Sequence, residues 1–448
     1  MLPHERSRMR EGDTTLIYWA PLLHFYQPPT QIPSVLERIC NESYRPLIRV
    51  FEEYPHAKVT VNINGSLTEM LRHHGQVDVI EGLRALARRG QLEFTGSGKY
   101  HPILPLISED EQRRQIVLNR KTNGYLFGDA FEPVGFLPPE MAYSRAVVRP
   151  IIETGHRWIL ISGVACPTDW PMDVIHQVRV EEGEIAVFFR DDILSNKISF
   201  QSFSGEQFIQ HLASLDGQGR DMYVITAMDA ETFGHHIQDW ETTFLAQVYE
   251  ALQPGQPVLS GVRQAKDLAD QHRGLLRMPQ VTETGEIRIA KISELLDIFP
   301  IGDAIDPKNS SWSASAEDIA AGNPYPLWKD RDSLIHRLQW QHMGICVDLV
   351  KTACGVAKDD FSGHFASIAR GLLDQALHSC QFWWASRRPM WDVNMIHKGL
   401  LEQQEVILNA YKAINSSGAS DRVKTDCYYR VIAARDLASK IVDHLFMY

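Results

Sequence analysis

Several features that define common protein classes are missing from this chain of 448 residues. No apolar run approaches the ~18 residues that a membrane-spanning helix requires. The longest run lies at 158–164 and is typical of a buried strand. The charged first 13 residues lack the apolar stretch of a secretory signal. The six cysteines include no Cys-x-x-Cys pair, so neither a zinc knuckle nor a disulfide framework is predicted. We therefore expect a cytoplasmic protein with free thiols and no membrane partner.

An excess of basic charge is also missing. Lys and Arg total 45 against 56 Asp and Glu, which gives a formal net charge of −11. Binding to duplex nucleic acid requires a basic footprint, so we expect no nucleic-acid partner. The sequence contains no Walker loop, no Gly-x-Gly-x-x-Gly fingerprint and no Gly-x-Ser-x-Gly elbow. We expect no cofactor, and catalysis by a serine nucleophile has little support.

The first ~300 residues alternate short apolar runs with amphipathic stretches. Runs typical of strands lie at 16–24, 58–63, 91–95, 133–137, 158–162, 223–228 and 256–259. Helical patterns lie at 43–54, 77–89 and 263–271, and a further helix is expected after Ser108. Glu111 follows Ser108 at the spacing of a capping box. This alternation predicts βαβ units and a mainly parallel sheet.

The pattern changes near residue 324. Long helices are predicted at 328–354, 361–386, 394–414 and 421–448. We predict two domains: a barrel with its connecting region at 1–323, and an α-helical domain at 324–448 that completes the cleft. The helical domain could also bury a dimer interface, so a homo-oligomer remains open.

Polar side chains follow the predicted strands at the point where each strand ends. They are His24, Asn64, His101, Glu140 and Asp229. In a βα barrel the carboxyl ends of the strands gather on one face, where catalytic groups collect. Two carboxylates from different strands suit glycoside hydrolysis, one as nucleophile or base and the other as general acid. The alternative is structural, since either carboxylate could cap a helix or pair with an arginine.

A metal site is a second possibility for the same region. Its candidate ligands are His24, His101, His235, His236, Asp229 and Glu231. No His-x-x-x-His or His-Glu-x-x-His spacing supports such a site. Hydrogen bonds from these histidines to substrate hydroxyls or to the backbone are the simpler interpretation, and we assign no metal ligand.

Aromatic residues could also contact a sugar. Ten tryptophans are present, and Trp383 and Trp384 are adjacent on a predicted helix. Aromatic faces stack on the apolar surface of sugar rings, although adjacent tryptophans on a helix more often pack in a core. Trp312 lies in a boundary region at 303–326 that is rich in Asn, Ser, Gly and Pro.

Five segments, in order, resemble the motifs of glycoside hydrolase family 57. They are His-Phe-Tyr-Gln-Pro at 24–28, Gly-Lys-Tyr-His-Pro at 98–102, Phe-Leu-Pro-Pro-Glu-Met-Ala-Tyr at 136–143, Asp-Ala-Glu-Thr-Phe-Gly-His at 229–235, and the stretch 376–384. The fourth segment is the most specific and the third is next. Together they span most of the chain.

The resemblance implies an incomplete (β/α)7 barrel followed by helices, acting on α-linked glucans with retention. It implies Glu140 as the nucleophile and Asp229 as the general acid/base of a double displacement. The partner would be an oligosaccharide or polysaccharide substrate. The candidate substrate-binding residues are His24, Gln27, Asn64, His101, Glu231, His235, Trp312, Trp383 and Trp384.

Five positions depart from the family pattern. Tyr26 stands where the family usually has a second His, Phe136 replaces Trp, and Pro139 is an extra proline beside the implied nucleophile. Cys380 stands where the family usually has Asp, and Gln381 where it often has Trp. Two alternatives therefore stay open beside the amylase or 4-α-glucanotransferase type. One is a metal-dependent enzyme similar to a polysaccharide deacetylase or an α-mannosidase, and the other is a carbohydrate-binding protein that has lost catalysis.

Overall fold

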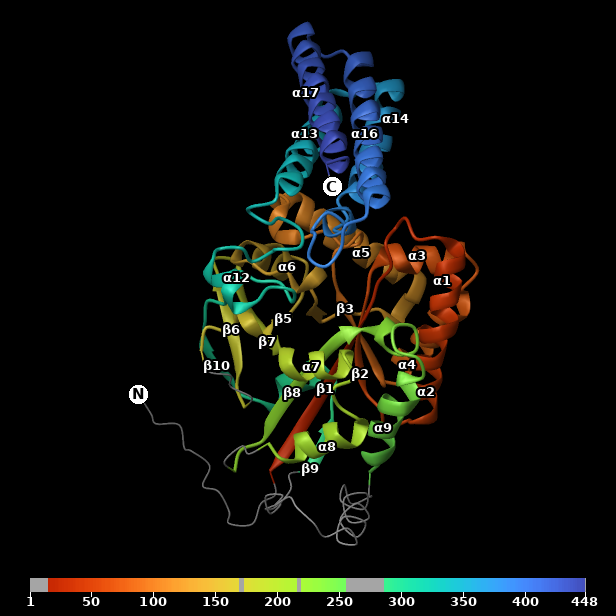
Figure 1. Cartoon of the computed structure of the whole chain (residues 1–448), viewed down its shortest axis with the longest axis vertical. Helices are drawn as coiled ribbons and strands as arrows, with labels where there is room; N and C mark the ends of the chain where they lie inside the picture. The colour runs from red at the N-terminus through yellow and green to blue at the C-terminus, as the bar shows by residue number, and fades with distance from the viewer. Residues whose placement is uncertain (1–14, 169–172, 216–218, 255–285, 448) are drawn as a thin grey trace.

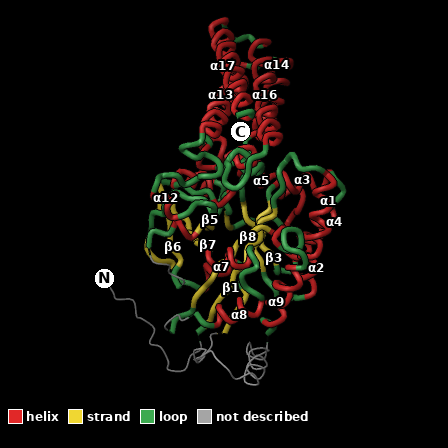
Figure 2. Tube along the Cα trace, viewed as in Figure 1, coloured by secondary structure: helices red, strands yellow, loops and turns green. Residues whose placement is uncertain are grey.

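The computed structural model describes residues 15–168, 173–215, 219–254 and 286–447 (Figure 1). The strand predicted at 256–259 and the helix predicted at 263–271 lie outside these residues. The described chain forms a curled sheet surrounded by helices, and four long helices extend from one end of it (Figures 1 and 2).

Ten strands form the sheet. They are β1 (Leu16–Phe25), β2 (Val59–Ile63), β3 (Leu92–Gly96), β4 (Gly135–Phe136), β5 (Trp158–Ser162), β6 (Ile175–Val180), β7 (Gly183–Arg190), β8 (Met222–Asp229), β9 (Glu286–Ile289) and β10 (Ile301–Ala304). Their order is β10-β6-β7-β5-β4-β3-β2-β1-β8, and β9 pairs with the start of β1. All pairs are parallel except β6 with β7. The sheet curls into a half-barrel, which confirms the predicted incomplete (β/α)7 type.

The helices of the barrel part flank the strands. They are α1 (Pro33–Ile39), α2 (Arg45–Glu53), α3 (Gly65–His73), α4 (Val77–Arg88), α5 (Glu109–Phe127), α6 (Val148–Glu153), α7 (Asp192–Ser199), α8 (Gly205–Ala213), α9 (Gln247–Ala251), α11 (Ile292–Ile298) and α12 (Ala316–Ala320). The later helices are α13 (Leu334–Val356), α14 (Asp360–Ala376), α15 (Cys380–Trp383), α16 (Val393–Ser416) and α17 (Asp421–Leu445).

The predicted strands that lie in the described residues are all present, as β1 to β5 and β8. The hairpin of β6 and β7 was not predicted, because β6 lies near the sheet margin and buries only Ile175 and Val178 of a sequence that is half polar. The capping box predicted at Ser108 and Glu111 is wrong. Ser108 is the N-cap residue of α5 but its side chain makes no cap bond, and Glu111 instead binds Arg370.

The register of β1 aligns polar residues at the carboxyl edge of the sheet. His24 lies opposite Asn62 of β2 on one side and opposite Asp229 of β8 on the other. A contact between β7 and β8 closes the sheet further. Arg190 Nε, at the end of β7, donates to the Ala227 carbonyl oxygen of β8 at 2.7 Å. Strand ends that are distant in sequence are therefore brought to one side of the half-barrel, as expected for this architecture.

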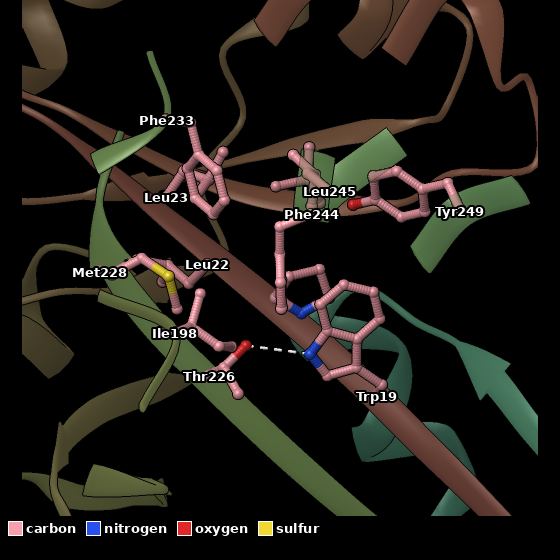
Figure 3. Close-up of a pocket in the computed structure, with 12 residues that line it drawn as sticks. Trp19, Leu22, Leu23, Ile198, Thr226, Met228, Phe233, Phe244, Leu245 and Tyr249 are labelled. Atoms are coloured by element: carbon pink, nitrogen blue, oxygen red, sulfur yellow. Dashed lines mark hydrogen bonds between the residues drawn. The ribbon is translucent and has the colours of Figure 1, made fainter. Parts of the chain in front are cut away.

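Below this edge, β1 and β8 pack against helices through an apolar pocket (Figure 3). The Trp19 indole N–H donates to Thr226 Oγ1 at 2.9 Å, and the Met228 and Tyr249 side chains also line the pocket. No carboxylate lines it. This pocket is therefore part of the core and separate from the polar strand ends.

A buried ion network joins α14 to α5 of the barrel. Arg370 binds both oxygens of the Glu111 carboxylate, at 2.7 and 2.8 Å, and also contacts Asp374. Arg114 binds both oxygens of Asp374, at 2.7 and 2.6 Å. Bidentate guanidinium–carboxylate pairs fix orientation as well as distance. The network therefore fixes the C-terminal half of α14 on the barrel.

Within the residues that the structure describes, no helix is both long enough and apolar enough to cross a membrane.

Candidate active site

Glu140 follows β4 in a tight turn at Pro139–Met141. Glu140 and Met141 have positive φ angles of 59° and 48°, a conformation that L residues adopt only when their surroundings hold it. The Trp312 indole N–H donates to Glu140 Oε2 at 2.7 Å. Burial and then the negative charge of Asp229 raise the pKa of Glu140 to about 8, and the bond from Trp312 opposes that rise. The Glu140 carboxyl group is therefore close enough to Asp229 to be affected by its charge.

Asp229 is the last residue of β8 and is only partly buried. Its charge acts on Glu140, Glu231, His24 and His236, since it contributes to the pKa shift of each. Asp229 is therefore the electrostatic centre of the residues gathered at this edge.

His24 and His101 form a neutral polar wall beside the carboxylates. Their rings stack with centroids 5.1 Å apart. His24 Nδ1 is 2.7 Å from Asn62 Oδ1. Burial lowers the pKa of His24 and lowers that of His101 well below its usual value. Neutral imidazoles can each donate and accept a hydrogen bond, which suits contacts with sugar hydroxyls.

His101 is held by the helical region. Its Nδ1 lies 3.0 Å from Ser379 Oγ and 3.6 Å from Glu140 Oε1. The Ser379 backbone N–H also donates to the His101 carbonyl oxygen at 3.1 Å. His101 itself has a positive φ of 58°. The helical region thus determines the position of a side chain that borders Glu140.

Glu231 lies beneath the site and is only 3% exposed. Gln27 Nε2 donates to Glu231 Oε1 at 2.8 Å, and the Tyr44 hydroxyl donates to the same oxygen. Burial and the charge of Asp229 raise the pKa of Glu231 to about 8. Gln27 and Glu231 therefore bind each other and stabilise the loop after β8. Both side chains are buried, so neither forms an exposed surface of the site.

The loop after β8 packs closely against the turn that follows α1. Gly234 has φ +97°, and a Cβ atom there would lie 1.8 Å from the Glu42 carbonyl oxygen. Only glycine fits this approach. His235 Nδ1 bonds Glu42 Oε2 at 2.6 Å, whereas His236 interacts electrostatically with Asp229. Of the two adjacent histidines, His235 is therefore bound to Glu42, and His236 is the one that interacts with Asp229.

Three other predicted substrate-binding residues are placed elsewhere. Asn64 is fully buried and donates to the Gly98 carbonyl oxygen, so it joins two strand-end loops. Trp383 and Trp384 pack against two different apolar clusters of the helical region. Both tryptophans therefore pack against a core, which is the alternative expected for adjacent tryptophans on a helix. Trp312 does reach the site, but its N–H is used by Glu140.

Sequence reasoning missed several residues of this region. They are Asn62, Tyr44, Arg190 and Ser379. Asn62 carried a usable signal, because a polar amide inside an apolar strand run has to find a buried partner. The Arg190 guanidinium lies 5.8 Å from the Trp312 ring centroid, a contact between distant segments that no local pattern reveals.

Among the described residues, no group of three or more His, Cys, Asp or Glu side chains is arranged to hold a metal ion.

Comparison with known proteins identifies relatives of the chain. The model of glycosyl hydrolase family 57 matches residues 18–273. Alpha-amylase 1 of Dictyoglomus thermophilum is 33% identical over 254 residues, which are 53% of this chain and 36% of that protein. The 4-alpha-glucanotransferase of Thermococcus litoralis is 27% identical over 221 residues, 47% of this chain and 32% of its own length. The chain thus matches about a third of the length of these curated relatives.

A solved structure matches nearly the whole chain. The GH57 branching enzyme of Thermococcus kodakaraensis superposes with a TM-score of 0.69 at 14% sequence identity. The match covers 94% of this chain and 95% of that enzyme. The helical region as well as the barrel thus belongs to the shared fold.

Proposed function

The chain belongs to glycosyl hydrolase family 57, and from that premise we propose that it is a retaining glycoside hydrolase or transglycosylase that acts on α-linked glucans. Glu140 is the nucleophile and Asp229 the general acid/base. The observation that carries the proposal is the position of these two carboxyl groups, which come from the carboxyl ends of different strands, with the charge of Asp229 acting on Glu140. The amylase and glucanotransferase names of the relatives support the substrate class.

In the first step a Glu140 carboxylate oxygen attacks the anomeric carbon. The protonated Asp229 carboxyl group donates its proton to the glycosidic oxygen, and the bond between that oxygen and the anomeric carbon breaks. The leaving chain departs with a free hydroxyl group. Glu140 is then joined to the sugar as an ester, which divides one difficult displacement into two easier ones.

In the second step the ester is resolved from the same face. The Asp229 carboxylate removes a proton from water or from a sugar hydroxyl, whose oxygen attacks the anomeric carbon and releases Glu140. Water as acceptor gives hydrolysis, and a sugar gives chain transfer. Two inversions at the anomeric carbon leave its configuration retained.

The pair needs one proton to begin this cycle. The raised pKa of Glu140 depends partly on the negative charge of Asp229. When Asp229 carries the proton, that charge is absent and Glu140 ionises more readily. The Trp312 N–H then stabilises the Glu140 carboxylate. The bond from Trp312 therefore supports the state that the mechanism needs, in which Asp229 is the acid and Glu140 the nucleophile.

The proposal is tested by incubating the purified protein with maltooligosaccharides and amylose beside E140Q and D229N variants, and resolving products by size. The wild type is expected to shorten or redistribute the chains, while each folded variant does neither. Normal turnover by either variant would overturn the assignment. An inactive wild type would overturn the substrate class.

A further inference from the structure

Tyr26 and Cys380 contact each other across the boundary between the barrel and the helical region. The Tyr26 hydroxyl oxygen lies 3.1 Å from Cys380 Sγ, although the two residues are 354 positions apart. Tyr26 directly follows β1, and Cys380 begins α15. Tyr26 is partly exposed, whereas Cys380 is buried. The Tyr26 side chain therefore reaches the surface, and Cys380 packs behind it.

The His101 ring lies between this pair and Glu140. The Tyr26 ring stacks on His101 with centroids 3.9 Å apart and planes inclined by 16°. His101 Nδ1 in turn lies 3.6 Å from Glu140 Oε1. Burial, Cys380 and the charge of Glu140 all raise the pKa of Tyr26, so Tyr26 is a neutral phenol at physiological pH.

Cys380 also interacts with His378 of the helical region, and His378 Nε2 bonds Glu402 Oε2 at 3.0 Å. Burial opposes protonation of His378, but Cys380 and Glu402 together raise the pKa of His378 to about 9. The side of the wall that faces His101 is therefore formed by the Tyr26 phenol, with the Cys380 sulfur and the bonded His378–Glu402 pair next to it.

We propose that Tyr26 and Cys380 act as one unit that determines the specificity of the sugar subsite beside Glu140. The proposal rests on the glycan-active function described above. The phenol and the thiol satisfy each other, and sulfur is a weak hydrogen-bonding group. A wall of this kind does not require a sugar hydroxyl opposite it. The subsite therefore accepts glycosyl rings in which that one hydroxyl is absent or substituted.

The family pattern places a His and an Asp at these two positions, and a carboxylate there would behave differently. A site built to hydrogen-bond a hydroxyl rejects the analogue that lacks it by about 10⁴-fold or more, because its buried polar groups lose their partner. A weakly polar wall discriminates far less. The pair of Tyr26 and Cys380 thus relaxes the selection for one sugar hydroxyl. Other groups, such as His24, recognise the remaining hydroxyls.

The test compares α-glucosyl fluoride with the four analogues that each lack one hydroxyl group, at C2, C3, C4 or C6. For every variant, kcat/KM on the parent is divided by kcat/KM on each analogue. The wild type is expected to discriminate less than about tenfold at one hydroxyl. The double variant Y26H/C380D should increase discrimination at that hydroxyl by about 100-fold and leave the other three ratios unchanged. Unchanged ratios at all four would overturn the proposal.

A cycle with smaller changes decides the matter if Y26H/C380D does not fold. Tyr26→Phe keeps the ring stack and removes the hydroxyl, and Cys380→Ala removes the sulfur. If the two residues act as one unit, the double variant changes the ratio no more than either single variant does. Additive changes would overturn the proposal. The matched controls Tyr249→Phe and Cys427→Ala alter buried residues away from the site and should leave every ratio unchanged.

Failure of the inference differs from failure of the proposed function. A wild type that turns over α-glucosyl fluoride, with ratios insensitive to Tyr26 and Cys380, overturns the inference alone. A wild type that does not turn over this donor, together with an E140Q variant that does not bind maltotetraose in calorimetry, overturns both.

Discussion

Trp312 contacts Glu140 through both its side chain and its backbone. The indole N–H donates to Glu140 Oε2 at 2.7 Å, and the Trp312 backbone N–H donates to the Glu140 carbonyl oxygen at 3.1 Å. Trp312 follows β10 in the connecting region, whereas Glu140 follows β4. One residue of the connecting region therefore fixes the orientation of the proposed nucleophile and favours its ionised form.

Replacing Trp312 by Phe should raise the pKa of Glu140, because the N–H that stabilises the carboxylate is lost. A hydrogen bond to a charged group contributes about 1.5–3 kcal/mol, so the acidic limb of the kcat/KM profile should move up by about one pH unit. We expect kcat to fall about tenfold or more. Pre-steady-state and steady-state assays on a maltooligosaccharide across pH 4–10 measure both effects.

The control for this variant is Trp340→Phe, which removes an indole N–H that donates to the Trp328 carbonyl oxygen in the helical region. It should leave the pH profile in place. A W312F enzyme with the wild-type acidic limb would mean that Trp312 only fills space.

Breaking the ion network between α5 and α14 should destabilise the protein. Arg370→Met leaves Glu111 and Asp374 without their shared cation, and both carboxylates are buried. Removing one partner of a buried ion pair costs about 3–5 kcal/mol. We expect a loss of this size in the free energy of unfolding, measured with urea.

The matched control is Arg430→Met, because Arg430 pairs with exposed Asp348. Exposed pairs contribute less than about 1 kcal/mol. Equal losses for the two variants would contradict a special role for the buried network.

Glu231 should make stability decline as pH rises. Its pKa is raised from 4.5 to about 8 in the folded protein, so between these values the folded state holds a proton that the unfolded chain has released. The free energy of unfolding therefore decreases as pH rises through this range. E231Q has no such proton, and its amide oxygen can still accept from Gln27 and Tyr44.

We therefore expect a shallower decline for E231Q than for the wild type in urea unfolding series between pH 5 and 8. An exposed exchange, Glu405→Gln, should parallel the wild type. If E231Q also paralleled it, Glu231 would be ionised throughout that range.

The strands that could be predicted from sequence are those that are largely buried. β5 is an apolar run covered on both faces, and parallel strands of this kind need no alternation. β2 is also buried throughout, although Thr60 and Asn62 within it are polar. β6 is polar at every second or third position and β9 is only four residues long. Neither differs in pattern from a loop, because tertiary pairing rather than local sequence makes them strands.

The site was predictable where a residue sits at a strand end and not where it comes from elsewhere. His24 and Asp229 follow apolar runs, and the parallel register places them opposite each other. Trp312 and Ser379 reach Glu140 and His101 from segments 172 and 278 positions away. The contact between Tyr26 and Cys380 is of the same kind, so two departures from the family pattern became one feature only in three dimensions.

The central claim is that Glu140 becomes covalently joined to the sugar. A ring-fluorinated α-glucosyl fluoride tests it, because the ring fluorine slows the second step and lets the ester accumulate. After proteolysis, mass spectrometry locates the label. The account predicts one labelled peptide, modified at Glu140, and no label in the E140Q variant. A label on Asp229 or Glu231, or an active enzyme that forms no ester and inverts the anomeric centre, would contradict it.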